Sequence, residues 1–341
     1  MKACVVHGRG DLRIDELPVP EPEPGQLLVA VEYGGICGSD LHYYHDGAAG
    51  DFRVVEPLVL GHEIVGRVAS VGASADSRRA GVPVAVHPAT PCGDCPECRA
   101  GRRNICRNAR YLGSAARRPH VQGGFAEFIA VRSEQARFLP EGIDLARAAL
   151  AEPLSVALHA VRRAGPVAGA GALVVGAGPI GCLVVAALHQ GGAAWIAATD
   201  LADAPLEVAR AVGATHAVRA DRVGSSSWPD AVDVAFEASG SVAGLRTCVE
   251  SVRRGGTVVL LGLLPPGEVG LLGNLVVTRE LELRGAFRFD EEFDTSVQLL
   301  VDGLDVEPVV THRFPLSQAH RAFDIASDRS VASKVLLDLR Q

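Results

Sequence analysis

A glycine pattern between residues 172 and 200 constrains the fold more than any other feature. The apolar segment Ala172-Leu-Val-Val runs into Gly176-Ala-Gly178-Pro-Ile-Gly181, and an apolar helical segment follows at once. A second apolar segment begins at Trp195 and ends on Asp200, 19 residues after Gly181. A strand, a glycine-rich turn, a helix and an acidic residue at this spacing form the fingerprint of a dinucleotide-binding βαβ unit.

Each residue of this turn has a separate expected role. Gly176 permits a tight turn, Gly178 lets the backbone approach a pyrophosphate, and Gly181 lets the helix pack on the strand. Pro179 and Ile180 open the helix, whose first amides can hold phosphate. The alternative, a glycine-rich turn in another α/β domain, is disfavoured by the spacing.

Asp200 predicts the choice of cofactor. Its carboxylate is expected to accept hydrogen bonds from the adenosine ribose hydroxyls and to repel a 2′-phosphate. The sequence therefore favours NAD over NADP.

Strand and helix patterns continue to alternate after Asp200. Strands are expected at 232–237, 256–262 and 280–287, and helices at 242–252 and 291–301. This alternation predicts a doubly wound parallel sheet. Before the sheet, a helical pattern runs from Asp144 to Val161, and Pro153 predicts that it is kinked or divided into two helices.

The N-terminal part has a different pattern. Short strands separated by Gly and Pro are expected at 2–7, 27–33, 64–71, 82–87 and 123–131, which predicts a small β-barrel. After about residue 285, a short helix at 317–325 and a last strand at 334–339 are expected to return to this first domain. The predicted division is 1–151, 152–284 and 285–341.

Four cysteines form a metal-binding pattern inside the first domain. Cys92, Cys95, Cys98 and Cys106 have the spacing of a closed tetrahedral Cys4 zinc site. The site leaves no open position for a substrate, so a zinc there is expected to be structural and to hold a lobe at about 90–110. The alternative is a set of free thiols in a loop.

A second metal site is predicted from residues that lie farther apart. Cys37 and His62 are read as two ligands of a catalytic zinc, which needs three protein ligands and an open position. Either Glu63 or Glu152 can complete the set, and the residues alone leave this choice open.

Composition and charge exclude several other classes. The net charge of −7 over 341 residues argues against a nucleic-acid binder. No charged residue occurs between Ala164 and Thr199, but recurrent Gly and Pro argue against an uninterrupted membrane helix. Met1 leads directly into an alternating segment rather than a signal-type apolar stretch, so a cytoplasmic protein without disulfides is expected.

Together, Cys37-Gly-Ser-Asp, Gly61-His-Glu, the four-cysteine lobe and the dinucleotide fingerprint resemble the zinc-dependent medium-chain dehydrogenases over essentially the whole chain. The resemblance implies an α/β protein in which a GroES-like β-barrel catalytic domain is joined to a doubly wound Rossmann domain. It also implies that the active site lies between the two domains, and that the protein is a homotetramer.

Further segments resemble the polyol branch of that family, which includes sorbitol, xylitol and L-idonate 5-dehydrogenases. They are Cys37-Gly-Ser-Asp-Leu-His-Tyr-Tyr44, Glu152-Pro-Leu-Ser-Val and Phe287-Arg-Phe. Ordinary alcohol dehydrogenases place a third cysteine ligand near the position of Glu152, so the carboxylate implies a polyol-type site. Segments near Tyr43, Arg110 and Pro119 are most similar to the L-idonate 5-dehydrogenase group.

The resemblance also assigns roles to single residues. Ser39 and His42 match proton-relay positions. By the same resemblance, Glu63 lies beside the zinc and Glu152 binds either the ion or its water. Tyr43 and Arg288 match substrate-pocket positions, and an Arg there would suit an acid or polyhydroxy substrate. The remaining cofactor positions are Gly262, Leu263, Phe287 and Arg288. Pro205 replaces a basic residue that relatives often carry, which again disfavours NADP.

The implied activity is transfer of a hydride from a secondary alcohol of a polyol or sugar acid to NAD, with two zinc ions per chain. The best match is an L-idonate 5-dehydrogenase type. The alternatives are a sorbitol or xylitol type and a zinc alcohol dehydrogenase for simple alcohols. A further alternative, from another class of function, is a non-catalytic scaffold that retains the fold. Such a protein is expected to have lost a zinc ligand or a relay residue.

Overall fold

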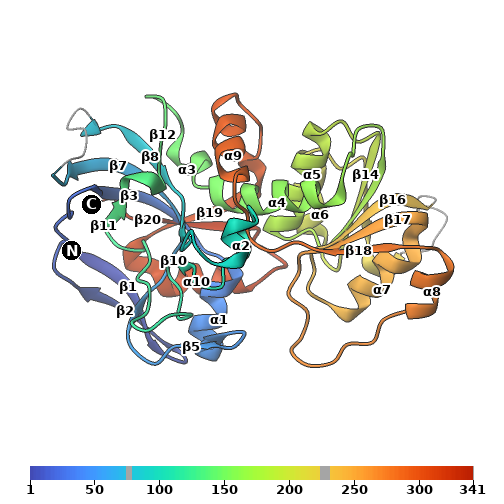
Figure 1. The fold of residues 1–341 in the computed structure, drawn as a ribbon, viewed down its shortest axis with the longest axis horizontal. Helices are drawn as coiled ribbons and strands as arrows, with labels where there is room; N and C mark the ends of the chain where they lie inside the picture. The colour runs from blue at the N-terminus through green and yellow to red at the C-terminus, as the bar shows by residue number, and fades with distance from the viewer. Residues whose placement is uncertain (74–78, 223–230, 341) are drawn as a thin grey trace.

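The computed structural model describes residues 1–73, 79–222 and 231–340, and these residues form two lobes joined across the middle of the molecule (Figure 1). Both termini lie in the N-terminal lobe. Its main sheet has the order β12-β8-β7-β3-β20-β19, with β11 paired to β3. The strands of this sheet are β3 (Gln26–Gly35), β7 (Glu63–Val71), β8 (Pro83–Val86), β11 (Phe128–Arg132), β12 (Ala136–Phe138), β19 (Val310–Pro315) and β20 (Lys334–Asp338).

The same lobe contains a smaller three-stranded sheet. Its order is β2-β1-β6, formed by β1 (Lys2–Gly8), β2 (Asp11–Glu16) and β6 (Leu58–Val59). The C-terminal strand β20 pairs antiparallel with β3, so the end of the chain returns to the N-terminal lobe. The shorter elements are α1 (Gly38–Asp46), β4 (Ala48–Ala49), β5 (Phe52–Arg53), β9 (Ala89–Thr90), α2 (Pro96–Arg99), β10 (Arg110–Tyr111) and α10 (Ala319–Ser327).

The second lobe contains a parallel sheet of the order β15-β14-β13-β16-β17-β18. The chain starts in the middle at β13, moves outward to β15, and then returns to fill the other side, which confirms the predicted doubly wound sheet. The strands are β13 (Gly171–Val175), β14 (Trp195–Asp200), β15 (His216–Arg219), β16 (Val232–Glu237), β17 (Val252–Leu260) and β18 (Glu282–Gly285). The helices are α5 (Pro179–Gln190), α6 (Asp203–Ala211), α7 (Val242–Ser251) and α8 (Gly273–Thr278). Helix α9 (Glu292–Val301) packs against α4 (Ala151–Ala164) and α3 (Leu145–Ala148) near the middle of the molecule (Figure 1).

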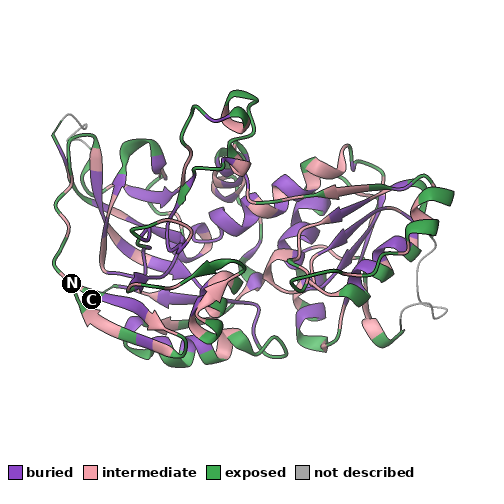
Figure 2. Cartoon of the chain, turned by 60° about the horizontal axis from the view of Figure 1, so that its bottom comes forward, coloured by how far each residue is buried: buried purple, intermediate pink, exposed green. Residues whose placement is uncertain are grey.

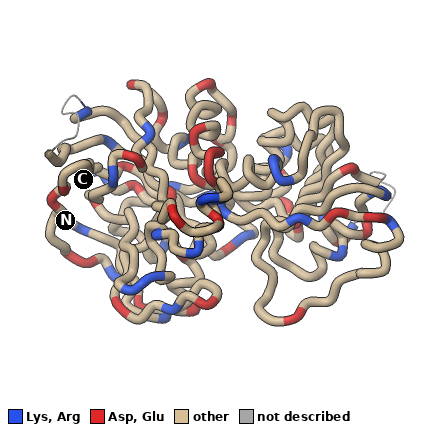
Figure 3. The backbone as a smooth tube through the Cα atoms, viewed as in Figure 1, with Lys and Arg blue, Asp and Glu red and all other residues tan. Residues whose placement is uncertain are grey.

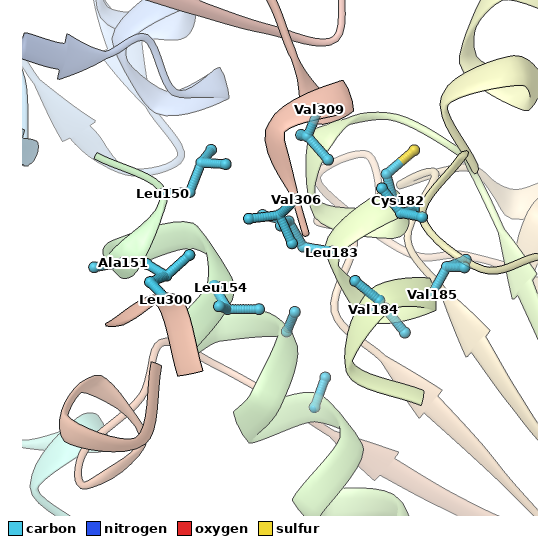
Figure 4. Close-up of a cluster of buried hydrophobic side chains, with 14 of the residues drawn as sticks. Leu150, Ala151, Leu154, Cys182, Leu183, Val184, Val185, Leu300, Val306 and Val309 are labelled. Carbon is cyan, nitrogen blue, oxygen red and sulfur yellow. The ribbon is translucent and has the colours of Figure 1, made fainter. Parts of the chain in front are cut away.

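The strands of both sheets are largely buried (Figure 2). One continuous core joins the two lobes around α4 (Ala151–Ala164). Leu154 of α4 packs with Leu183 of α5 and with Leu300 of α9 (Figure 4), and the same cluster reaches Val65 and Leu336 in the N-terminal sheet. Because α4 contributes to both sides, it fixes the position of Glu152 between the lobes.

The helical pattern at 144–161 forms two helices, α3 (Leu145–Ala148) and α4, which is one of the two predicted outcomes. The chain divides before Ala151 rather than at Pro153, which lies in the first turn of α4, where a missing amide is tolerated. Other expected elements differ in extent. The strand expected at 280–287 is limited to β18, and Glu280 before it and Arg288 after it adopt φ values of 49° and 53°. The strand expected at 123–131 begins only at Phe128.

The predicted boundaries at residues 151 and 284 stay predictions. Among the described residues, no helix is long and apolar enough to cross a membrane. Acidic and basic positions are interspersed along the backbone in both lobes (Figure 3).

Candidate metal and cofactor sites

Three of the predicted catalytic ligands lie together. One ligand atom from each of Cys37, His62 and Glu63 falls within 4.8 Å of the others. Cys37 is the N-cap of α1, whereas His62 precedes β7 and Glu63 begins it. In the register of β3 with β7, Gly35 lies opposite Glu63, and a Cβ at Gly35 would lie 2.1 Å from Glu63 Oε2. A glycine is therefore required to make room for the carboxylate.

Asp40 holds the two segments of this site together. Its buried carboxylate accepts a hydrogen bond from the Cys37 amide at 2.9 Å and another from the Gly61 amide at 3.2 Å. The same carboxylate lies 3.9 Å from His62 Nδ1. Burial raises the pKa of Asp40, and the nearby His62 opposes that shift. Asp40 was present in the motif that sequence reasoning singled out, but received no role.

The donor set of this site favours a cation. Burial alone would lower the pKa of His62, but Asp40 and Cys37 raise it to about 10. A thiol, an imidazole and a carboxylate within one small volume are the ligand types that zinc prefers, and three protein ligands leave a fourth position open. The residues therefore fit a catalytic zinc.

Glu63 has a fixed counter-ion. Lys334 Nζ donates to Glu63 Oε1 and Oε2 at 2.7 Å each, and also to the Ile36 carbonyl at 3.0 Å. Both side chains of the pair are almost fully buried. Sequence reasoning missed Lys334, although one signal existed: Lys occurs only at Lys2 and Lys334 in a chain whose other cations are Arg.

Glu152 lies outside the close set of three. Its buried carboxylate accepts a hydrogen bond from the Tyr111 hydroxyl at 2.6 Å. Burial raises the pKa of Glu152 to about 7, with His62 and Tyr111 opposing that shift. Tyr111 was missed as a site residue. Its ring lies edge-on to His62, with the two ring centroids 5.5 Å apart.

The predicted relay and pocket residues lie on α1 and at the end of the parallel sheet. Ser39 is half-buried in the first turn of α1. His42 is exposed, and its Nδ1 lies 3.0 Å from Asp46 Oδ2. Tyr43 is buried, and its hydroxyl accepts a hydrogen bond from the Ala115 amide at 3.1 Å. The Arg288 guanidinium lies 4.3 Å from the centre of the Tyr111 ring. Since the Tyr111 hydroxyl bonds Glu152, Tyr111 contacts both Arg288 and Glu152.

The four cysteines of the lobe converge. Their four Sγ atoms all lie within 4.8 Å of one another. The Sγ–Sγ distance is 3.7 Å between Cys95 and Cys106 and 3.5 Å between Cys106 and Cys92. A tetrahedral ion with Zn–S bonds of about 2.3 Å requires sulfurs roughly 3.8 Å apart. All eight cysteines of the chain are free of disulfides, and this group fits a closed zinc site.

The glycine-rich turn contains two positions that only a glycine fits, Gly176 and Gly181. Gly176 has a φ of 96°, and a Cβ there would lie 2.6 Å from the Ser239 amide. A Cβ at Gly181 would lie 1.8 Å from the Gly176 carbonyl, so helix and turn could not approach so closely with a larger residue. A Cβ at Gly178 would meet nothing within 4 Å. Gly178 precedes Pro179 and Ile180, which form the first turn of α5.

Asp200 is held in place at the end of β14. Its carboxylate accepts hydrogen bonds from the amides of Ala177 (2.8 Å), Leu201 (2.7 Å) and Ala202 (3.2 Å). The acidic residue is thereby bonded directly to the glycine-rich turn.

The other predicted cofactor positions follow the ends of neighbouring strands. The Gly262 amide donates to the Glu237 carbonyl at 2.9 Å, and a Cβ at Gly262 would lie 2.4 Å from the Gly240 amide. Leu263 is 78% exposed and Phe287 is 48% exposed, so both apolar side chains have an uncovered surface that a bound molecule could bury.

Comparisons with known proteins agree with this geometry. The family described as "Alcohol dehydrogenase GroES-like domain" matches residues 23–141, and the family described as "Zinc-binding dehydrogenase" matches residues 179–302. A sorbitol dehydrogenase from Bacillus subtilis (strain 168) is 36% identical over 333 residues, which is 96% of this chain and 93% of that protein. An L-idonate 5-dehydrogenase (NAD(P)(+)) from Escherichia coli (strain K12) is 36% identical over 341 residues, which is 98% of each.

A solved structure extends the likeness to three dimensions. The crystal structure of L-idonate 5-dehydrogenase from Escherichia coli K-12 matches with a TM-score of 0.93 at 35% identity, over 99% of this chain and 97% of that one. Fold and site together define an NAD(P)-dependent, zinc-binding dehydrogenase. The chain belongs to the zinc-dependent medium-chain dehydrogenase family, in its polyol dehydrogenase branch. The predicted family, fold class and enzyme class are thus confirmed.

Proposed function

We propose that this dehydrogenase oxidises a secondary alcohol of a polyol or sugar acid with NAD, at a zinc held by Cys37, His62 and Glu63. The close approach of these three donors, within 4.8 Å, is the observation that carries the proposal. When bound, zinc would supply Lewis acidity toward the alcohol oxygen and NAD would accept the hydride.

Glu63 is the better third ligand because its carboxylate is already in the donor set. Lys334 offsets its charge, and a zinc ligand whose position is fixed by a hydrogen-bonding partner is common in metal sites. Glu152 then remains free of the set and bonds Tyr111. From there its carboxylate can hold a water or a substrate hydroxyl.

A sugar acid is the favoured substrate class, with L-idonate as the best guess. Arg288 supplies a guanidinium for a carboxylate beside the Tyr111 ring, and a carboxylate–guanidinium pair gives two directed hydrogen bonds. One of the relatives that matches nearly full length is named an L-idonate 5-dehydrogenase. Tyr43 would line the polar side of the same pocket.

Ser39 and His42 are proposed to carry the proton away from the alcohol. Ser39 is half-buried and His42 is exposed on the same helix, three residues apart, so the pair leads from the site toward water. Asp46 Oδ2 lies 3.0 Å from His42 Nδ1 and would hold the orientation of the ring.

NAD is the proposed cofactor, bound by the Gly176–Gly181 turn, Asp200 and the residues near Gly262 and Phe287. Arg219 lies beside Asp200 in the register of β15 with β14 and is the cation placed to meet a 2′-phosphate. Its guanidinium is already bonded to Asp221 at 3.3 Å and lies 3.7 Å from Asp203. These carboxylates offset its charge, which supports NAD over NADP.

Two zinc ions per chain, a homotetramer and a cytoplasmic location complete the proposal. The converging cysteines support the second zinc, and thiolates of this kind persist in a reducing compartment. Strand β18 lies at the edge of the parallel sheet, and Val277 of the neighbouring α8 is 75% exposed, which supports a subunit contact there.

A substrate panel tests the proposal. L-idonate, D-gluconate, sorbitol, xylitol, ribitol and simple alcohols are each assayed with NAD and NADP. Oxidation of L-idonate with NAD as the best pair is the expected result. A preference for sorbitol or xylitol would instead assign the neutral-polyol type, and a preference for simple alcohols would overturn the polyol proposal. Absence of activity in protein that contains zinc would favour a non-catalytic scaffold.

A further inference from the structure

The segment that carries Arg288 is held in an unusual backbone conformation. It connects β18 to α9, and Arg288 has a φ of 53°. Residues other than glycine avoid this left-handed region, so they adopt it stably only where the surrounding structure holds the chain on both sides. The contacts that hold this segment therefore decide where the guanidinium lies.

Two of those contacts come from the cysteine lobe. Asn104 Nδ2 donates to the Phe287 carbonyl at 2.9 Å, immediately before Arg288. On the other side, the Arg103 amide donates to Asp290 Oδ2 at 3.2 Å, and Arg103 Nε lies 2.9 Å from Asp290 Oδ1. The lobe lies at the centre of the molecule, where α2 is seen near the junction of the two domains (Figure 1). Residues 103 and 104 thus bracket Arg288.

Asn104 is also joined to a buried polar network behind the segment. Its Nδ2 lies 3.5 Å from His159 Nε2, and His159 Nδ1 lies 2.9 Å from Glu292 Oε1. Glu292 Oε2 in turn accepts from the Asp290 amide at 2.9 Å. His159 and Glu292 are both buried, so this network cannot shift without losing hydrogen bonds that water does not replace. Asn104 is consequently fixed at both of its contacts.

The held segment places Arg288 against the active site. The central carbon of its guanidinium lies 4.3 Å from the centre of the Tyr111 ring and 4.9 Å from the centre of the Phe287 ring. The Tyr111 hydroxyl donates to Glu152. Movement of residues 287–290 would therefore move the cation relative to the predicted substrate site.

We propose that Asn104 and Arg103 are positioning residues, through which the cysteine lobe orients Arg288 toward the anionic end of the substrate. Neither residue touches the zinc ligands of the catalytic site. The lobe would then serve substrate selection as well as stability. The role assigned to Arg288 here rests on the proposed function, but the placement of residues 287–290 by the lobe does not.

The kinetic test compares Asn104→Ala and Arg103→Ala with Arg102→Ala, a neighbouring exposed arginine of the same lobe, in the zinc-loaded full chain. With L-idonate, Asn104→Ala is expected to raise KM about tenfold while kcat changes less than about threefold. With a neutral polyol such as sorbitol, KM should change less than about threefold. When Arg288→Ala is already present, adding Asn104→Ala should change KM for L-idonate less than about twofold. Both substitutions act on the same interaction, the one between Arg288 and the substrate.

Hydrogen exchange tests the placement independently of activity. In Asn104→Ala, amides in a peptide covering residues 286–292 should exchange about tenfold faster than in Arg102→Ala, with the rest of the protein unchanged. Asn104→Asp keeps the shape of the side chain and removes the two N–H donors of Nδ2. It should show the same faster exchange as Asn104→Ala and replaces that variant if the alanine protein is unstable. Exchange equal to that of Arg102→Ala would overturn the inference. So would additive effects of Asn104→Ala and Arg288→Ala on KM. An inactive wild type with faster exchange in Asn104→Ala would overturn the proposed function and the substrate role of Arg288, but retain the positioning by the lobe.

Discussion

Lys334 and Glu63 form a buried ion pair in which one ammonium group contacts both oxygens of one carboxylate, each at 2.7 Å. The two residues are 271 positions apart in the chain. They meet because β20 and β7 both pair with β3. Burial lowers the pKa of Lys334, but Glu63 and Cys37 raise it above its usual value, so the lysine is charged. The last strand thus supplies the counter-ion of a proposed zinc ligand.

Removal of this counter-ion should be costly. In Lys334→Met, the Glu63 carboxylate stays buried without its partner, and the free energy of unfolding of the metal-free protein should fall by about 3–5 kcal/mol. Urea denaturation measures the change. Lys2→Met, which removes the other lysine at an exposed position, is the control and should change stability by less than about 0.5 kcal/mol. Equal stabilities for the two variants would contradict a structural role for the ion pair.

Tyr111→Phe isolates the hydrogen bond to Glu152. The substitution keeps the ring between His62 and Arg288, but leaves the buried carboxylate without its donor at 2.6 Å. We expect kcat/KM to fall about tenfold, since loss of one hydrogen bond to a charged group costs roughly 1.5 kcal/mol. Steady-state kinetics with the best substrate of the panel measures this. Tyr44→Phe, on α1, is the control, and a similar loss there would point to a general effect of removing a hydroxyl.

Asp200→Ala should weaken the preference for NAD. The carboxylate accepts hydrogen bonds from three amides. Because it is proposed to repel a 2′-phosphate, the ratio of kcat/KM for NAD to that for NADP should fall at least about tenfold in the variant. Glu207→Ala removes an exposed carboxylate from the adjacent helix α6 and should leave the ratio unchanged. A wild type that prefers NADP would contradict the argument from Asp200 altogether.

Two cysteine substitutions should remove different zinc ions. Cys92→Ser lacks one thiolate of the lobe, whereas Cys37→Ser lacks one of the three catalytic donors. Metal analysis should give about two zinc ions per wild-type chain and about one in each variant. Cys37→Ser should abolish activity and largely keep thermal stability, and Cys92→Ser should lower the melting temperature. A single zinc in the wild type would rule out one of the two sites.

His87, which belongs to neither set of metal donors, predicts a pH dependence of stability. Burial and Arg137 lower the pKa of His87 to about 4, and its ring packs against Phe289 and Phe293. In the unfolded chain the pKa of His87 is about 6.5. Between about pH 6.5 and pH 4, His87 therefore binds a proton in the unfolded chain but not in the folded chain. The folded state is therefore favoured fully above pH 6.5, and this advantage is lost as the pH falls from about 6.5 toward about 4.

His87→Gln should remove this dependence. Urea denaturation at pH 7.5 and at pH 5.5 gives the free energy of unfolding of both proteins. The value for the wild type minus that for the variant should be about 1 kcal/mol smaller at pH 5.5 than at pH 7.5. Both proteins carry the same metal ligands, so acid release of zinc affects them alike. An unchanged difference between the two pH values would contradict the assigned pKa.

Sequence reasoning succeeded where the groups of a site are close along the chain. The glycines at 176, 178 and 181 and the cysteines at 92, 95, 98 and 106 are brought together by a single turn or lobe, so their spacing alone predicts their geometry. Alternating strand and helix patterns likewise predicted a doubly wound parallel sheet, and the order of its strands came from the structure. The strand expected at 280–287 was too long: β18 begins after Glu280, whose φ is left-handed, and ends at Gly285.

The chain by itself determined the dinucleotide unit, the cysteine lobe and the pair Cys37 and His62. Only the tertiary structure decided that Glu63 joins this pair, that Lys334 offsets its charge, and that Tyr111 links Glu152 to Arg288. These contacts join residues from different strands and from both domains. They depend on strand register and on the packing of α4 between the domains, and neither leaves a local periodicity in the sequence.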